Sequence, residues 1–441
     1  MRGLSVILVA LALFATSLAV ATSARATTAS DPAPTLVLGP TDRFGGGAVV
    51  AVQTGETTFG VRYGTQDHPN DLMIFAEYRR YLGGADLYDH DGNYVRSQGI
   101  PVYTLLAQRL DLLVEFNDTN QDGLLNFHAM DRFGNVSGND TPVKALALTT
   151  AWDLTGPTTE VVGDTTYVNF TLSARNLPYS VVWDPLPRRG TDQDGRLDLL
   201  AFTFHLRADI RGFSATVPWY SVTLGDGLER SIERAKFLEW RNVTGRAVEV
   251  GAKYDHDIEG WDFAAPTDLL ALETHLIFGN LIPGPVAEFL HLVYYRDHAE
   301  SPDGRYHQDA NSTEPDHPML YTQDRIYFAD DWERVGHFQW TSNVTVDGVD
   351  ATMTFQVQGG GPISLYGAHG LFLGFGIRGA FIYPNGQSIF HDPAMFTEAI
   401  PLSFPTGFNA TPVTILAAQL ALVALAMGPA LYLRAKARRA K

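Results

Sequence analysis

The sequence contains no cysteine. Secreted eukaryotic proteins of this size usually carry disulfides, because an oxidising exterior lets them form and persist. The absence therefore favours a protein of a prokaryotic envelope. It also excludes thiolate nucleophiles, iron–sulfur clusters and zinc sites built from cysteine.

Recognisable enzyme signatures are missing as well. The chain has no G-x-S-x-G elbow, no phosphate-binding G-x-x-x-x-G-K-[S/T] loop and no G-x-G-x-x-G turn that opens a predicted helix. We therefore expect a non-enzymatic protein. A hydrolase stays open as an alternative, because paired carboxylates for glycoside cleavage are recognised by their separation in space and not by a motif.

Basic residues are few and are concentrated at the two ends of the chain. There are 32 Lys and Arg against 49 Asp and Glu, which gives a net charge of −17. Seven basic residues and no acidic ones lie in the terminal segments, so the remainder carries 25 basic and 49 acidic residues. Nucleic acid is excluded as a partner, because phosphate binding needs a basic footprint. The surplus of carboxylates instead suits divalent cations or solubility in a salty medium.

Both ends of the chain have the features of membrane targeting. Residues 1–26 combine a basic start, an apolar run and a small-x-small site before Thr27, which predicts a secretory signal peptide; an uncleaved membrane helix is the alternative. An uncharged run of 19 residues predicts a transmembrane helix over 414–433. Five basic residues follow in 434–441, so we expect a cytoplasmic tail, with the rest of this single-pass cell-membrane protein outside the cell.

Sequons for N-glycosylation are frequent. An exposed N-x-[S/T] site in an extracellular protein is an acceptor for N-glycans, and the alternative is a Thr-rich β-protein that collects such triplets by composition. A glycoprotein without cysteine fits an archaeal surface protein best. The predicted acceptors are Asn117, Asn135, Asn169, Asn242, Asn311, Asn343 and Asn409, with Asn139 a weaker site because Pro142 follows its Thr.

The hydrophobic pattern is mostly that of β-strands. Residues 351–357, 371–377 and 168–172 alternate apolar and polar side chains, as half-buried strands do. The chain also spreads 41 Gly and 24 Pro along its length, which suits many short strands joined by turns. The fold class predicted is mainly β.

A connecting helix is predicted near the middle of the chain, over 226–243. Asp226 and Glu229 have the spacing of a capping box, and the apolar side chains that follow, Ile232 and Ala235 among them, recur at helical spacing. Segments about 180–185 residues apart are weakly alike on either side of it. The sequence thus predicts two tandem β-sandwich-like domains. Their bounds are 37–225 and 244–400, with a spacer over 401–413 before the C-terminal transmembrane helix.

One acidic segment predicts a calcium site. It resembles the D-x-N-x-D-G loop of EF-hand-like and dockerin-like repeats, in which alternating oxygen ligands converge on one hard cation. The resemblance implies ligation by Asp118, Asn120, Asp122, the carbonyl of Leu124, and Asn126. The twelfth position is Ala129 and not an acid, so Asp131 or a remote carboxylate is expected to complete the shell.

Two further acidic segments are weaker calcium candidates. One contains Asp192, Asp194 and Asp198, and the other runs from Asp89 to Asn93. The alternative for all three segments is an ordinary hairpin turn, because Asp-Gly and Asn-Gly favour such turns. If calcium binds, we expect it to stiffen loops in a chain without disulfides.

Other candidate sites are less specific. Residues 297–317 are rich in His, Asp and Glu, as in a transition-metal site, but they also suit a solvated loop. The tryptophans at 219, 240, 261, 332 and 340 are expected in the core more than on a sugar-binding platform. We expect a structural, adhesive or ligand-binding protein whose partners are other surface proteins or glycans. The alternatives are a tethered hydrolase, and a membrane-fusion or lattice-assembly protein with an apolar loop over Phe372–Ile382.

Overall fold

The computed structural model describes the chain between residues 33 and 401. The gaps are 42–45, 56, 127–128, 131–135, 138–139, 184–185, 226–231, 284–318, 322–324, 330–333, 368–369 and 398–399. Every regular element of these described residues is a β-strand, which confirms the mainly β prediction. The same residues hold no helix of the length and apolarity needed to cross a membrane. The predicted signal peptide, transmembrane helix and basic tail lie outside the described residues.

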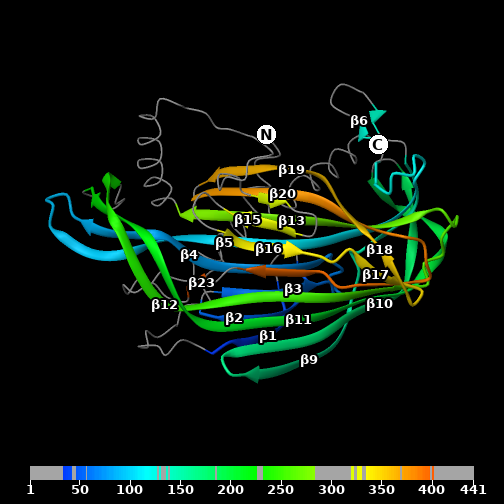
Figure 1. Cartoon of the computed structure of the whole chain (residues 1–441), viewed down its shortest axis with the longest axis horizontal. Helices are drawn as coiled ribbons and strands as arrows, with labels where there is room; N and C mark the ends of the chain where they lie inside the picture. Colours follow the sequence, from blue (N-terminus) through cyan, green and yellow to red (C-terminus); the bar gives the residue numbers. More distant parts are fainter. Residues whose placement is uncertain are drawn as a thin grey trace. The chain divides into compact units, whose positions relative to one another are not determined.

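The strands are labelled in Figure 1. They are β1 Thr35–Pro40, β2 Ala48–Thr54, β3 Thr57–Tyr63, β4 Leu72–Tyr88, β5 Tyr94–Asn117, β6 Ala129–Met130, β7 Val136–Ser137, β8 Thr141–Ala147, β9 Asp153–Val162, β10 Thr165–Trp183, β11 Leu186–Leu224, β12 Ile232–Glu259, β13 Leu269–Pro283, β14 Met319–Tyr321, β15 Arg325–Ala329, β16 Arg334–Gln339, β17 Asn343–Val346, β18 Val349–Thr352, β19 Thr354–Gly367, β20 Gly370–Tyr383, β21 Ser388–His391, β22 Ala394–Thr397 and β23 Ile400–Pro401.

Antiparallel pairing joins these strands into two runs. The first run is β1–β2–β3–β4–β5–β13–β20–β19. The second is β9–β10–β11–β12, continued by β21, β22 and β23, with β16 and β17 beyond them. Strand β8 links the runs by pairing with both β5 and β10.

One hydrophobic core is shared by the two runs. Strand β11 shows the underlying pattern, because Phe202, Phe204 and Leu206 are fully buried while the residues between them are half-exposed. Across the core, the side-chain amide of Gln108 on β5 donates to the hydroxyl of Tyr254 on β12 at 2.7 Å. The two predicted domains are therefore wrong as separate bodies. Residues 34–408 form one compact unit, because strands from both halves pair and bury apolar surface together.

A buried ion pair also joins distant parts of this unit. Glu115 is fully buried and accepts hydrogen bonds from Trp261 Nε1 at 2.8 Å and from the backbone N–H of Ala264 at 2.6 Å. Its partner Lys144 lies 3.2 Å away, with its Nζ 4.7 Å from the ring centre of Tyr179. Burial raises the pKa of Glu115, and the donated hydrogen bonds and the Lys144 charge offset part of that effect.

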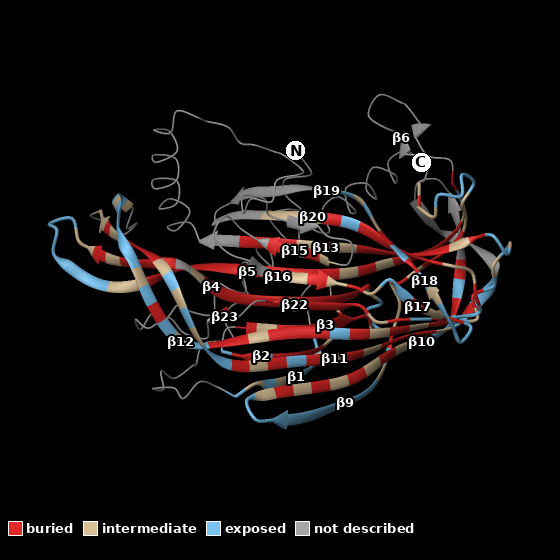
Figure 2. Cartoon of the chain, in the orientation of Figure 1, coloured by how far each residue is buried: buried red, intermediate tan, exposed pale blue. Residues whose placement is uncertain are grey.

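Two hairpins continue beyond this core, at the left of Figures 1 and 2. They are the distal parts of β4 and β5 (84–88 and 94–99) and of β11 and β12 (219–224 and 232–240), which we call the arm. The hairpins are joined because β4 and β11 pair in parallel over 84–88 and 219–223. Figure 2 shows that much of the arm is exposed.

The predicted connecting helix is wrong, because residues 232–243 lie in β12; residues 226–231 lie outside the described residues. Along the hairpin, Thr223 pairs with Arg234 but Leu224 pairs with Ile232, so Glu233 is an extra, bulged residue. The bulge puts Ile232 and Ala235 on one face, where both pack on the small apolar cluster of the arm. A strand with a bulge thus produced the three-residue spacing that mimicked a helix.

Candidate functional site

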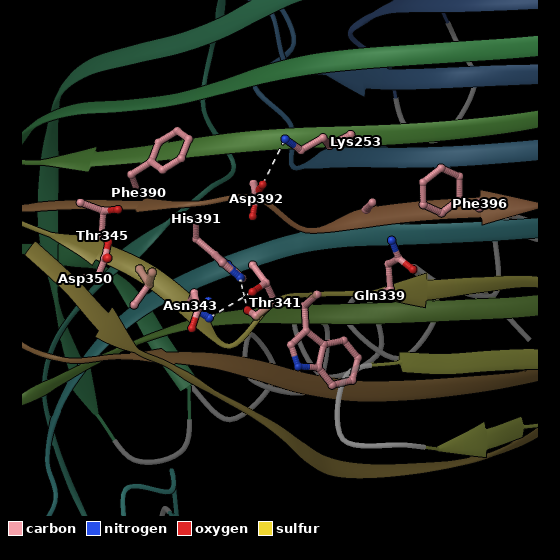
Figure 3. A pocket seen from close by; sticks show the side chains of 13 residues that line it. Lys253, Gln339, Thr341, Asn343, Thr345, Asp350, Phe390, His391, Asp392 and Phe396 are labelled. Atoms are coloured by element: carbon pink, nitrogen blue, oxygen red, sulfur yellow. Dashed lines mark hydrogen bonds and ion pairs between the residues drawn. The ribbon is translucent and has the colours of Figure 1, made fainter. Parts of the chain in front are cut away.

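A cavity of about 510 Å³ opens where β12, β16, β17, β18, β21 and β22 meet (Figure 3). Its walls combine aromatic rings with hydrogen-bonding side chains. The aromatic residues are Trp340, Phe390 and Phe396, and the polar ones are Lys253, Gln339, Thr341, Asn343, Thr345, Asp350, His391 and Asp392. This mixture of apolar surface and a few polar groups is typical of small-molecule sites.

The rings of Phe390 and Phe396 lie toward opposite ends of the cavity, with Asp392 and His391 between them (Figure 3). Phe390 leaves 39% of its surface exposed, so an apolar face is available to a ligand. The alternation along β21 and β22 explains the arrangement, because Ile389 and Met395 point into the core while Phe390 and Phe396 point away from it.

Charge in the cavity is paired and is negative overall. Lys253 Nζ lies 3.0 Å from Asp392 and 3.5 Å from Asp255. The hydrogen bond with Asp392 raises the pKa of Lys253 and keeps it charged. Asp350 adds a further carboxylate to the lining. The local field therefore disfavours anionic ligands.

Behind the cavity wall, a chain of hydrogen bonds runs into the core. The Nε2 of His391 donates to the carbonyl oxygen of Thr341 at 2.8 Å, so its Nδ1 is the acceptor for the Tyr383 hydroxyl at 3.2 Å. That hydroxyl in turn accepts from His256 Nε2 at 2.7 Å. The Nδ1 of His256 has no partner among the described residues, as fits a neutral ring with its proton on Nε2.

Burial keeps both histidines neutral. Desolvation lowers the pKa of His391 to about 4 and lowers that of His256 well below its usual value, while it raises the pKa of Tyr383. Both ring nitrogens of His391 are engaged, so the ring serves to hold Thr341 in place rather than to take a proton from a ligand. The chain is a rigid support for the cavity wall.

The predicted Asp118 loop is a compact turn that gathers several of its predicted ligands. Asp118 accepts backbone N–H bonds from residues 122 and 123, the second at 2.8 Å. The carboxylate of Asp122 accepts from the side-chain amides of Asn120 at 2.7 Å and Asn126 at 3.0 Å. Hydrogen bonds thus hold these four side chains within one turn, and Leu124 follows in the same turn. Asp131 lies outside the described residues.

Sequence reasoning missed one carboxylate of this loop. Asp140 is fully buried, and its oxygens accept the backbone N–H groups of Thr119 at 3.3 Å and Asn126 at 2.5 Å. Desolvation raises its pKa, and the nearby charges of Asp118 and Asp122 add to that rise. Asp140 follows the loop only after a gap in the described residues, so the local spacing of the motif did not predict its position. No group of three or more His, Cys, Asp or Glu in the described parts of the chain has metal-binding geometry.

The second calcium segment is not a loop. Residues 192–198 lie within β11, where Asp192 pairs with Ser180 and Leu197 with Leu177. The Asp-Gly dipeptide at 194–195 signalled a turn, but the strand continues through it, and Asp198 is exposed beside Gly260. The side chains of Asp192 and Asp194 lie outside what the structure describes. The third segment is a turn, in which Asp89 accepts from the backbone N–H of Asn93 at 2.7 Å.

The described sequons differ in accessibility. Asn242 and Asn343 are exposed, as an acceptor must be. Asn117 donates to Asp268 at 2.9 Å, and Asn169 lies 2.9 Å from His205 Nδ1, so both half-buried amides are already engaged. Asn135, Asn311 and Asn409 lie outside the described residues, as does the His-rich segment 297–317.

The aromatic predictions are confirmed in part. Trp219, Trp261 and Trp340 are buried, but Trp240 on the arm is 59% exposed; Trp332 is not among the described residues. The apolar stretch Phe372–Ile382 is no loop, because it lies in β20 between β13 and β19. Phe390 and Phe396 were missed, since an isolated Phe in a β-rich sequence carries no signal of exposure. In comparisons with known proteins, the chain matches no family model and no curated protein.

Proposed function

We propose that the chain is a membrane-anchored, N-glycosylated protein of an archaeal cell surface that binds a ligand outside the cell. The anchor is the C-terminal helix predicted over 414–433. In this proposal the two runs of strands form a β-sandwich-like unit, and calcium in the Asp118 loop stiffens one end of it. The preferred role is ligand binding, within the broader class of structural and adhesive surface proteins.

The cavity beside His391 is the observation that supports binding. It is open, it is supported by paired strands, and its lining offers aromatic and polar groups together. Two of its ionisable groups are held by neighbours: Asp392 by Lys253, and His391 by Thr341 and Tyr383. Asp350 is the remaining carboxylate of the described lining. Glycoside cleavage needs a pair of available carboxyl groups, so the alternative of a hydrolase receives less support from this arrangement.

The topology is tested on intact cells of the source organism. A protease that cannot cross the membrane should cleave the chain, and alkaline extraction should leave the anchor fragment in the membrane. A variant truncated after Phe408 should be secreted. Protection of the whole chain from the protease, or retention of the truncated variant in the membrane, would overturn the proposal.

A second candidate function is assembly of copies through the arm. Among the described residues, the outer edge of β12 from Ile232 to Gly245 pairs with no strand, and such edges readily add another chain. Phe237 is 40% exposed on this edge.

A charge placed on the edge tests this assembly. The variant Phe237→Lys should lower the oligomeric state of the full chain in detergent, measured by light scattering, because a charged side chain on an edge strand opposes pairing with another chain. The apolar variant Phe237→Leu should keep the oligomer. A monomeric parent chain, or an oligomer that Phe237→Lys leaves intact, would exclude the arm as an interface.

A further inference from the structure

We infer that the cavity beside His391 binds a neutral, extended oligosaccharide, an assignment that rests on the proposed ligand-binding function and names its ligand class. The inference stands on the shape of the cavity, its hydrogen-bonding groups, its charge and the pairing of the strands around it. Each of these features narrows the class of ligand.

The shape favours an extended ligand over a compact one. Phe390 and Phe396 are six residues apart on a chain that runs through β21 and β22, so at full extension they lie at most about 20 Å from each other. Their rings flank the cavity at its two ends (Figure 3). A linear chain of several sugar units can place apolar ring faces on both Phe side chains, which a single sugar cannot.

The polar groups between the rings suit hydroxyls. Asn343 and Gln339 each offer amide donors and an acceptor, and Thr345 offers a hydroxyl that both donates and accepts. Sugar hydroxyls also donate and accept, so such side chains can match them in several orientations. Alternation of these groups with aromatic faces therefore matches the alternating polar edges and apolar faces of sugar rings.

Charge disfavours an anionic ligand. The only cation in the lining, Lys253, is already held by Asp392 and Asp255, and Asp350 lies in the lining as well. A phosphate, sulfate or uronate would meet a field that is negative overall and would find its one cation engaged. Anionic polysaccharides are therefore outside the predicted class.

The surrounding strands disfavour a peptide. Extended peptides gain affinity by adding a strand to a free sheet edge. Strand β21 is paired on both sides, with β12 and β17, and β22 is paired on both sides, with β12 and β16. Among the described strands β18 pairs only with β17, but the two strands that carry Phe390 and Phe396 have no free edge. Recognition beside these rings must therefore come from side chains.

The test uses the full chain, produced in a host without N-glycosylation and held in a detergent without a sugar head group. Asn343 lines the cavity, so this inference requires that its sequon carries no glycan, and the chosen host ensures that Asn343 is unmodified. The probes are neutral tetrasaccharides of glucose, mannose, xylose and N-acetylglucosamine, with a galacturonic acid tetramer, choline and a neutral polar heptapeptide as comparisons. Binding is measured by calorimetry and by saturation-transfer NMR.

We expect at least one neutral tetrasaccharide to bind and the galacturonic acid tetramer not to bind. The variant Phe390→Ala should weaken that binding about tenfold without a change in melting temperature, because the ring is exposed and contributes a stacking contact. The matched control Val161→Ala removes exposed apolar surface on β9 and should leave binding unchanged.

Three outcomes overturn the inference: no neutral tetrasaccharide binds, Phe390→Ala leaves the affinity unchanged, or only choline, the peptide or the anionic tetramer binds. Binding of choline alone would reassign the cavity to cationic amines. These outcomes are distinct from failure of the proposed surface location, which protease access on intact cells decides independently.

Discussion

Strands β11 and β12 run through both the body of the unit and the arm. Comparing the two regions shows which interactions stabilise each of them. In the body of the unit, Phe204 on β11 and Tyr254 on β12 are fully buried against both runs of strands. In the arm, Phe237 and Trp240 on the same β12 are 40% and 59% exposed. The backbone pairing is continuous between the two regions, so hydrogen bonding alone does not distinguish them.

Burial is what distinguishes them. The apolar clusters of the arm are small: Ala85, Leu87, Tyr220 and Val222 pack with the adjoining Ile100, and Trp219 packs with Val243. Within the described residues no second layer of strands covers the arm, so folding removes much less of its apolar surface from water. The arm should therefore be the less stable region, able to open locally while the body stays folded.

The largest expected difference comes from matched truncations of phenylalanine. Phe204→Ala in the body should lower the free energy of unfolding by about 3–5 kcal/mol, because a buried ring is replaced by a cavity. Phe237→Ala in the arm should cost less than about 1 kcal/mol, because that ring is already partly in water. Chemical denaturation of both variants measures the difference. Equal losses would show that the arm is as fully packed as the body.

Matched ion pairs give the next difference. Lys144→Met leaves Glu115 charged and buried beside Trp261, which should cost about 3–5 kcal/mol. In the arm, the exposed Glu239 lies 2.6 Å from Arg241, so Glu239→Gln should cost about 0–1 kcal/mol. The double variant Lys144→Met, Glu115→Gln should regain part of the loss, because no unpaired charge remains. Failure to regain it would assign the loss to packing around Tyr179.

The third difference is pH dependence. Burial lowers the pKa of His391 in the folded state to about 4, below the 6.5 of an exposed imidazole. The unfolded chain therefore binds a proton first as the pH falls, so stability is complete above pH 6.5 and declines toward pH 4. His391→Gln should reduce that decline by on the order of 2 kcal/mol. In the arm, His90→Gln removes an exposed side chain and should change the slope less. Equal slopes for His391→Gln and the parent would contradict the buried neutral histidine.

The same contrast explains which features the sequence could predict. Alternation of apolar and polar residues identified parts of β10, β19 and β20. In β10 its cause is plain, because Val168, Phe170 and Leu172 are buried at every second residue. The single core could not be predicted, since pairing of β5 with β13 joins residues about 165 apart. In the arm few side chains are buried, so no clear alternation marks the strand. The bulge at Glu233 instead produced an apolar spacing that resembles a helix. Burial of one face therefore produces the alternation from which a strand can be predicted, and an exposed strand lacks it.

Candidate sites follow a similar rule. The Asp118 loop was predictable because its ligands are adjacent in sequence and its backbone needs the turn that Gly123 allows at a positive φ of 71°. The cavity was not predictable, because Lys253, Asn343 and Phe390 come from three strands that only the fold brings together. Local chemistry can be read from the sequence, whereas a site assembled from several strands requires the structure.

The smallest expected difference compares the Asp-Gly turns of body and arm. Calcium at about ten times its dissociation constant should stabilise the full chain by on the order of 1 kcal/mol through the Asp118 loop, a rise in melting temperature of roughly 2 °C.

Asp118→Ala removes the acceptor for two backbone N–H groups as well as a predicted ligand, so the variant melts at a lower temperature than the parent even without calcium. The informative quantity is therefore the rise in melting temperature on going from chelator to calcium. Asp118→Ala should abolish it, and Asp89→Ala in the arm should preserve it, because that turn offers fewer converging oxygens. An increment lost in neither variant, or absent from the parent, would reduce the Asp118 loop to a plain turn.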